Sequence, residues 1–116
     1  MRDPEMTHDD FVALQRRRCA AVAAAMLRGD VGLIDGARQL STLSHDVVEY
    51  WAEDEDFREF GVLDSETDHL PVGEQRALWA PAALAEKDAD VARIEASARA
   101  HVLAACRPVV ARFGGV

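Results

Sequence analysis

The residues most able to do chemistry gather between positions 64 and 79. Three alternating carboxylates open this segment as in a calcium-binding loop, but His69 stands where that loop requires glycine and Gln75 where it requires glutamate. An EF-hand is therefore not expected. A metal-dependent or acid–base enzyme is an alternative, built from Glu66, Asp68, His69 and Arg76. The whole candidate polar site comprises Asp64, Glu66, Asp68, His69, Arg76 and Trp79.

A structural role for the same segment is the interpretation we favour. Arg76 is able to pair bidentately with Asp68 or Glu66. The apolar side chains of Leu70 and Trp79 can fix the segment to a helical core. On this interpretation Arg76→Ala destabilises the protein, whereas an unchanged melting temperature would leave Arg76 free for a ligand.

The other histidines have ordinary roles in their sequence context. His45 and Glu49 are spaced as neighbours on one helix face, which favours a surface ion pair over acid–base chemistry. His101 lies between Ala100 and Val102 and is expected to be a core histidine. The sequence contains no HExxH, GxSxG, GxxxxGK[ST] or GxGxxG motif. We therefore assign no catalytic residue, no metal and no cofactor.

Two cysteines, Cys19 and Cys106, lie in alanine-rich helical patterns and form neither a CxxC pair nor a Cys/His metal pattern. We expect buried free thiols, and a disulfide between them is the less favoured alternative. The N-terminus lacks the basic start and apolar core of a signal peptide. No apolar stretch is long enough to span a membrane. These features predict a cytoplasmic protein that does not bind membranes.

Negative charge is concentrated in one stretch of the chain. The 116 residues carry a net charge of −8, and residues 53–68, with eight acids and one arginine, contribute −7 of it. This acid excess argues against a nucleic-acid partner, because phosphate binding requires clustered lysine and arginine. A local acidic patch instead attracts and orients a basic protein. The residues that we assign to partner binding are Glu53, Asp54, Glu55, Asp56 and Glu59.

We therefore expect a small acidic protein-binding module that masks a basic partner surface. Immunity proteins and antitoxins that neutralise nucleases have this character, because their carboxylates take the place of phosphates. This is a likeness of class and not a match of motifs. Besides the enzyme, a second alternative is a homodimeric helical assembly protein, in which an exposed apolar stripe meets its copy.

Helices must position these residues. An alanine-rich composition with few aromatic residues and no alternating β-branched runs predicts an all-α, three- to four-helix bundle. It forms one domain over residues 1–116, with a flexible N-terminus at residues 1–6. The first helix is expected from a cap at Thr7 to Arg28. The second begins at a cap near Asp30 and continues to Trp51, with Gly36 at a tight helix crossing.

A long ordered connector over residues 61–81 is expected between the second and the last long helix. It contains a short helical turn at residues 74–78, and Pro81 can open another short turn. Asp88 is predicted to cap the last long helix, which extends to Phe113. Inside this helix Pro108 predicts a kink near residues 104–107.

The segment SETDxLPxGxxRxxW at residues 65–79 resembles the signature of a family of small bacterial proteins grouped as a domain of unknown function. The stretch around Arg38 and Leu40 and the helix at residues 95–106 are also similar to that group, so the resemblance covers most of the chain. It implies no activity and no catalytic residue, because the group has none assigned.

Overall fold

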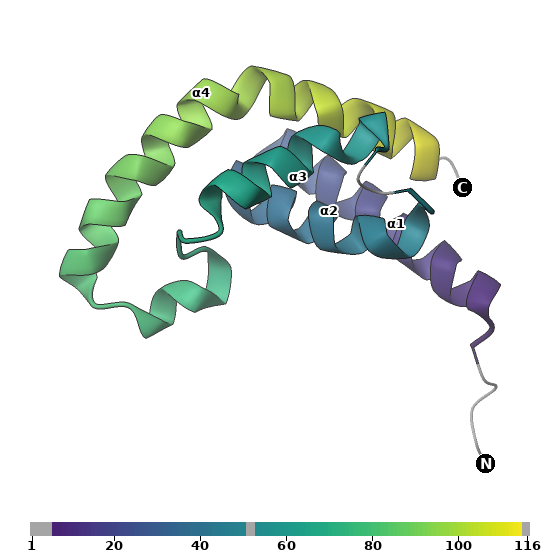
Figure 1. Cartoon of the computed structure of the whole chain (residues 1–116), viewed down its shortest axis with the longest axis horizontal. Coiled ribbons are helices and arrows are strands. Elements are labelled where there is room, and N and C mark those ends of the chain that lie inside the picture. The colour runs from purple at the N-terminus through teal and green to yellow at the C-terminus, as the bar shows by residue number, and fades with distance from the viewer. Residues whose placement is uncertain (1–5, 51–52, 115–116) are drawn as a thin grey trace, which may run out of the picture.

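The computed structural model describes residues 6–50 and 53–114. This part of the chain forms four α-helices and one 3-10 helix, without any strand: α1 (His8–Arg28), α2 (Leu33–Val47), α3 (Glu55–Thr67), η1 (Gly73–Leu78) and α4 (Pro81–Phe113). Figure 1 shows α1, α2, α3 and the C-terminal half of α4 packed together, while the N-terminal half of α4 extends beyond them. The predicted all-α bundle is confirmed. The predicted flexible N-terminus lies almost entirely outside the described residues.

The ends of α1 follow from its own sequence, as predicted. The Thr7 hydroxyl accepts a hydrogen bond from the Asp10 backbone N–H at 3.0 Å, and the Asp10 carboxylate accepts one from the Thr7 N–H at 3.2 Å. This reciprocal capping box satisfies two donors at the helix start. Gly29 ends the helix with a φ of 83°, which glycine adopts without strain.

The start of α2 depends on a distant residue. The prediction that Asp30 caps this helix is wrong, because the Asp30 carboxylate pairs with Arg28 at 2.9 Å and the helix begins at Leu33. The Glu95 carboxylate of α4 instead accepts hydrogen bonds from the backbone N–H groups of Leu33 at 2.8 Å and Ile34 at 3.3 Å. A carboxylate there satisfies two free donors and suits the positive end of the helix dipole.

Helix α2 crosses α1 at Gly36, as the sequence predicts. A β-carbon at Gly36 would overlap the side chain of Met26 on α1. The buried Met26 side chain therefore occupies the space that the glycine leaves open. The helix ends at Val47, earlier than predicted, and Trp51 lies outside the described residues.

The predicted long connector over residues 61–81 is wrong in its first part, because α3 occupies it. The chain is helical from Glu55 to Thr67, and Gly61 lies inside this helix. The side chains of Phe57, Phe60 and Leu63 turn into the core. Only residues 68–72 and η1 remain between α3 and the turn into α4, and η1 confirms the short helical turn predicted at residues 74–78.

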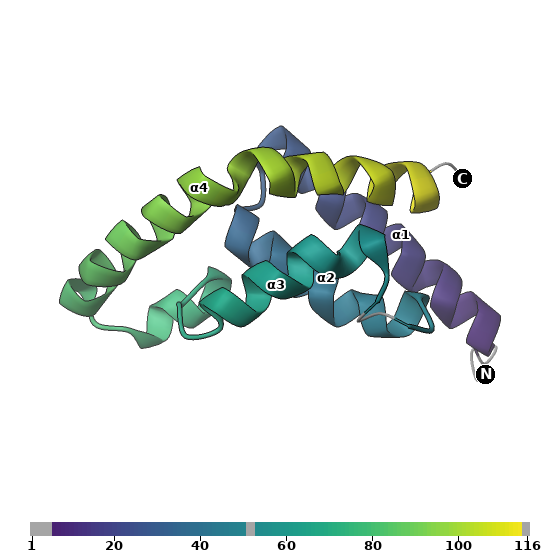
Figure 2. The ribbon, with the colours of Figure 1, turned by 45° about the horizontal axis from the view of Figure 1, so that its top comes forward.

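Helix α4 begins earlier than predicted. It starts at Pro81 and continues through Asp88 and Pro108 to Phe113, so Asp88 does not cap it. In Figures 1 and 2 the helix bends in its green part, on the N-terminal side of the yellow segment that contains Pro108. The visible bend is therefore not at the predicted residues 104–107. All of its buried residues lie in the second half, from Ala98 onward.

We call η1 and the N-terminal part of α4, residues 73–93, the arm. None of the η1 side chains is buried, and Figure 2 shows the arm arching away from the packed helices. The radius of gyration is 15.6 Å, compared with about 13 Å for a compact domain of this length. The arm contributes to this extended shape, as does the N-terminal part of α1, which also protrudes (Figure 1).

We predict that Glu95→Ala lowers the free energy of unfolding by about 1–2 kcal/mol, because two N–H groups at the start of α2 lose their acceptor. Urea unfolding followed by circular dichroism measures this change. The matched control is Glu86→Ala, which removes an exposed carboxylate from the same helix. Equal stability of the two variants would show that the cap contributes nothing.

Candidate functional site

Arg38 of α2 organises the segment that contains the candidate polar site. Its guanidinium donates to the backbone carbonyl oxygens of Thr67 at 2.6 Å and Leu70 at 3.3 Å. It also donates to the Gln75 side-chain oxygen at 3.0 Å and to the Asp64 carboxylate at 3.3 Å. Carbonyl groups at the end of a helix lack partners within the helix. One arginine thus closes α3 and fixes the chain that follows it.

Arg76 has a different partner from the predicted one. It forms a bidentate ion pair with Asp88 of α4, at 2.7 and 3.1 Å, and not with Glu66 or Asp68. The hydrogen bond to Arg76 lowers the pKa of the Asp88 carboxyl below its usual value. Both side chains are well exposed, so the pair orients the arm and contributes little to stability. The expected destabilisation by Arg76→Ala is therefore corrected to a negligible one.

The remaining members of the candidate polar site do not converge. Glu66 is exposed on α3, and the Asp68 carboxylate lies 3.9 Å from the His69 ring on the surface. Trp79 is half-buried, whereas Leu70 is 1% exposed and anchors the segment as expected. Within residues 6–50 and 53–114, no group of three or more His, Cys, Asp or Glu residues is placed to hold a metal ion. The geometry gives the enzyme alternative no assembled site.

Two histidine predictions also change. Glu49 lies beyond the end of α2, so the helical spacing between His45 and Glu49 does not exist. His101 is not a core residue: its side chain is 57% exposed, and its Nε2 atom lies 3.5 Å from the Glu59 carboxylate. His101 therefore lies on the side of α4 that faces α3, at the surface and outside the apolar core.

Cys19 and Cys106 are buried free thiols, as predicted. Burial raises the pKa of each thiol from 9.0 to about 11, and in Cys19 the nearby Asp46 adds to the rise. The Cys106 sulfur lies 3.8 Å from the sulfur of Met26. Protonated thiols surrounded by apolar atoms are poor nucleophiles, so neither cysteine is a catalytic candidate.

Part of the acidic stretch serves the fold. The Asp54 carboxylate accepts the backbone N–H of Asp56 and so caps α3. Arg112 of α4 donates to the Asp54 carboxylate at 3.0 and 3.2 Å and to Asp56 at 3.0 Å. These two acids, which we assigned to partner binding, therefore attach α3 to the end of α4. Glu53 and Glu55 are exposed and make no such ion pair within the described residues.

The outer side of α3 carries an acidic face, which we define as Glu55, Glu59, Val62 and Glu66. The spacing of four, three and four residues places these side chains on one helix face. Val62 is 50% exposed in the middle of this face. Two shallow grooves flank α3, one of about 290 Å³ toward α4 and one of about 450 Å³ toward α2, and both are lined by Val62 and Glu66.

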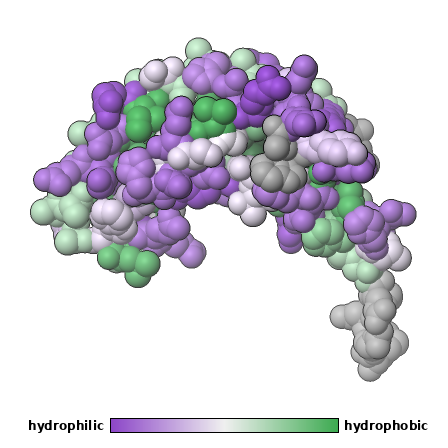
Figure 3. All heavy atoms as spheres, in the orientation of Figure 1, coloured by the Kyte–Doolittle hydropathy of each residue, from purple (hydrophilic) through white to green (hydrophobic). Residues whose placement is uncertain are grey.

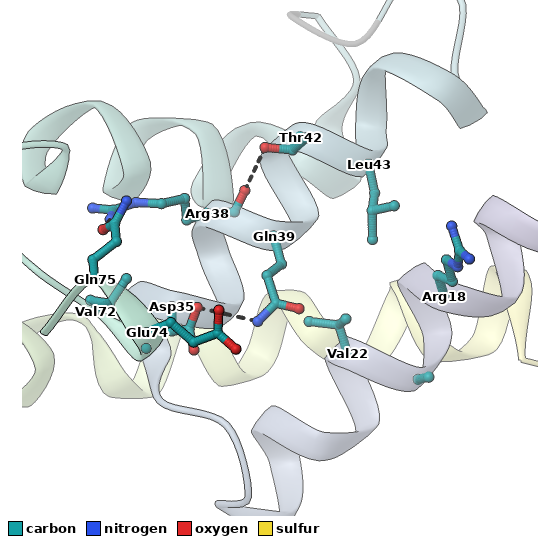
Figure 4. A pocket seen from close by; sticks show the side chains of 12 residues that line it. Arg18, Val22, Asp35, Arg38, Gln39, Thr42, Leu43, Val72, Glu74 and Gln75 are labelled. Atoms are coloured by element: carbon teal, nitrogen blue, oxygen red, sulfur yellow. Dashed lines mark hydrogen bonds between the residues drawn. The ribbon is translucent and has the colours of Figure 1, made fainter. Parts of the chain in front are cut away.

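A recess of about 700 Å³, larger than both grooves beside α3, lies between α1, α2 and residues 72–75, and we call it the α1–α2 groove. Figure 4 shows Val22 and Leu43 facing each other across its middle. Arg18 lies at one end, and Asp35 and Glu74 lie together at the other. No pattern along the chain predicts this groove, because its walls come from three segments that only the tertiary fold brings together.

None of the helices in the described part of the chain is both long and apolar enough to cross a membrane. Comparison of the chain with family models, with curated proteins and with solved structures finds no match. The resemblance to small bacterial proteins of unknown function therefore stays a prediction.

We predict that Arg38→Ala lowers the free energy of unfolding by about 2–3 kcal/mol, because it removes the donor to the Leu70 carbonyl, one of two donors to the Thr67 carbonyl and the partner of the Asp64 carboxylate. Arg38→Lys should recover little of this loss, because an ammonium group cannot reproduce the planar fork. Guanidinium chloride unfolding measures both variants. Arg99→Ala, at an exposed position of α4, is the control, and an equal effect at both positions would contradict the assignment.

We predict that alkaline pH destabilises the protein through its thiols. Because the folded-state pKa is raised from 9.0 to about 11, the contribution of the thiols to stability is complete below pH 9 and is lost as the pH rises toward 11. Urea unfolding in a reducing buffer, from about pH 8 to about pH 11, should show this decline. The double variant Cys19→Ala/Cys106→Ala should show a shallower decline, and an identical slope would refute the attribution.

Proposed function

We propose that this chain is a small protein-binding module whose acidic face masks a basic surface on a partner protein, in the manner of an immunity protein or an antitoxin. Six of the eight carboxylates of residues 53–68 fall into two groups, and the other two, Glu53 and Asp68, are exposed. Asp54, Asp56 and Asp64 are neutralised by arginines of the bundle. Within the described residues, Glu55 and Glu66 of the acidic face make no ion pair, and Glu59 has only the exposed His101 ring at 3.5 Å, so these carboxylates remain accessible to another protein.

The proposal rests on the position of Glu66. It lies in the last turn of α3, where negative charge is unfavourable because the helix dipole is negative at that end. Asp64, in the same turn, is compensated by Arg38 at 3.3 Å, but the Glu66 carboxylate is exposed without such a partner. Folding therefore gives no reason for an acid at this position, whereas binding to a cationic partner does.

The acidic face also offers the shape that a basic side chain requires. Lysine and arginine lay their aliphatic stems on apolar surface and keep the charged head in a polar setting. Val62 supplies exposed apolar surface, and Glu59 and Glu66 stand on either side of it along α3. The flanking grooves allow neighbouring residues of the partner to settle beside the helix. Carboxylates placed in this way steer association and depend on ionic strength.

The test begins with capture of a partner from a lysate of the source organism, followed by measurement of Kd at salt concentrations of about 50 and 300 mM. We expect the affinity to fall with salt. The triple variant Glu55→Gln/Glu59→Gln/Glu66→Gln should weaken binding by about tenfold or more.

The matched control is the triple variant Glu49→Gln/Glu74→Gln/Glu86→Gln, which makes the same change in net charge at three other exposed positions. It should bind with nearly unchanged affinity. Equal losses in the two triple variants would mean that net charge, and not the acidic face, determines binding. A partner whose affinity does not depend on salt would also contradict the proposal.

A further inference from the structure

We propose that the α1–α2 groove binds an amphipathic helix of a partner protein. The contact face of that helix carries a basic residue at one end, apolar residues in the middle and an acidic residue at the other end. Such an occupant needs charges of both signs, whereas the acidic face fits a basic surface. The inference therefore concerns a different surface and a different partner, and it does not depend on the proposed function.

One end of the groove carries negative charge that the fold does not neutralise. Asp35 and Glu74 lie together there (Figure 4). The Asp35 carboxylate suits the positive start of α2 and accepts a hydrogen bond from the neutral Gln39 amide at 3.2 Å. Glu74 adds a second negative charge beside it, and neither carboxylate forms an ion pair within the described residues. Arg38 also lines the groove, but its guanidinium binds Gln75 and the end of α3. A cationic side chain between the two carboxylates would relieve their mutual repulsion.

The opposite end of the groove carries Arg18 of α1. Its guanidinium donates to the side-chain oxygen of Gln15 at 2.7 Å, and Gln15 in turn donates to the Asp46 carboxylate at 2.9 Å. Because Gln15 is neutral, these hydrogen bonds position the arginine without neutralising it. Arg18 is exposed, and no carboxylate of the described residues binds its other N–H groups. They are therefore available to an acidic side chain of another protein.

The middle of the groove is apolar. Val22 of α1 and Leu43 of α2 face each other across it (Figure 4), and Ala21 and Val72 complete the apolar lining. On the face of the molecule seen in Figure 3, by contrast, hydrophobic side chains form small groups between hydrophilic ones. Apolar side chains that enter the groove would remove its lining from water, which is favourable. Acidic, apolar and basic groups thus follow one another along one recess of about 700 Å³.

The length of the groove matches about two turns of a helix. Its α2 wall extends from Asp35 to Leu43, which is about 12 Å along the helix axis. A helix docked along this wall presents residues spaced by three or four to the same side. A basic residue, apolar residues three and four positions later and an acidic residue seven positions later span about 10 Å. Such a helix would reach both ends and the middle of the groove at once.

The walls of the groove favour a helix over an extended peptide. Both long walls are α-helices, whose backbone groups bond within each helix, so an extended segment would find few backbone partners there. A docked helix satisfies its own backbone and needs only side-chain contacts. Small molecules are usually enclosed by their sites, but Gln39, Thr42 and Glu74 leave this groove exposed along its rim.

NMR titration of the full chain with synthetic helical peptides tests the proposal. The matching peptide is alanine-based and about 16 residues long, so that it forms a helix. It carries an arginine, two leucines three and four positions later, and a glutamate seven positions later. The control peptide has the same composition, with the arginine and the glutamate moved to the opposite helix face.

We expect the matching peptide to shift the methyl signals of Ala21, Val22, Leu43 and Val72, with a Kd below about 1 mM. It should bind about fivefold more tightly than the control peptide, because it gains two exposed ion pairs. The absence of shifts at about 1 mM peptide, shifts confined to other residues, or equal affinities for the two peptides would overturn the proposal.

A change of charge tests the basic end of the groove. Arg18→Glu makes both ends acidic, so this variant should bind the matching peptide about fivefold more weakly than the wild type does. It should prefer a peptide in which a second arginine replaces the glutamate. Arg99→Glu makes the same change at an exposed position of α4 and should keep the preference for the matching peptide. The same preference in both variants would contradict the assignment of Arg18.

A further pair of variants tests the recess itself. Ala21→Arg places a bulky side chain in the groove lining, and Ala100→Arg makes the same change at an exposed position of α4. Only Ala21→Arg should abolish peptide binding, and circular dichroism checks that both variants are folded. Octylamine supplies a cation and an apolar chain without a helix. Tighter binding of octylamine than of the matching peptide would make the groove a small-molecule site and overturn the proposal.

Discussion

The arrangement of the second half of the molecule depends on the guanidinium group of Arg38. Helix α3 ends at Thr67 without a glycine to close its last turn, so its free carbonyl groups need donors from elsewhere. Arg38 donates to one of them, the Thr67 carbonyl, which also accepts the Leu70 N–H. It also holds Leu70 and Gln75, which lie on the path from α3 into η1. Because η1 leads directly into α4, one side chain of α2 sets the direction in which the arm leaves the bundle.

A second long-range contact is made at the start of α2. Glu95 binds the first N–H groups of this helix, so α2 has a partner on α4 at its start and supplies Arg38 to α3 from its middle. Contacts of this kind require one geometry, whereas apolar packing tolerates several. The bundle owes its cohesion to the apolar core and its particular helix positions to these charged side chains.

Local signals in the sequence were sufficient for some elements. Thr7 and Gly29 mark the ends of α1 through their own conformational preferences, and the structure places them there. Pro81 was expected to open only a short turn, but it starts α4 itself. Helix α3 was missed because its first acids were interpreted only as a binding patch, although an acidic cap ahead of Phe57, Phe60 and Leu63 is also a helix-start pattern. Glu95 and Arg38 could not be assigned, because their partners lie 62 and 29 residues away along the chain.

Tertiary contacts, and not local sequence, also distinguish the acids that stabilise the fold from those of the acidic face. Asp54, Asp56 and Asp64 have structural partners that only the tertiary arrangement reveals. Glu66 has no such structural partner among the described residues. This difference distinguishes the acidic face from the rest of the acidic stretch. Charge alone predicted a partner-binding surface around residues 53–59, but only the structure shows which of these acids are held within the fold.

The most direct test of the role of Arg38 is nitrogen NMR of the arginine guanidinium groups in the wild-type chain. A guanidinium held by four acceptors rotates slowly about its terminal bonds, so Arg38 should give separately resolved, slowly exchanging terminal N–H signals. Exposed arginines such as Arg17 and Arg99 should give averaged signals. An averaged, rapidly exchanging signal for Arg38 would contradict the account.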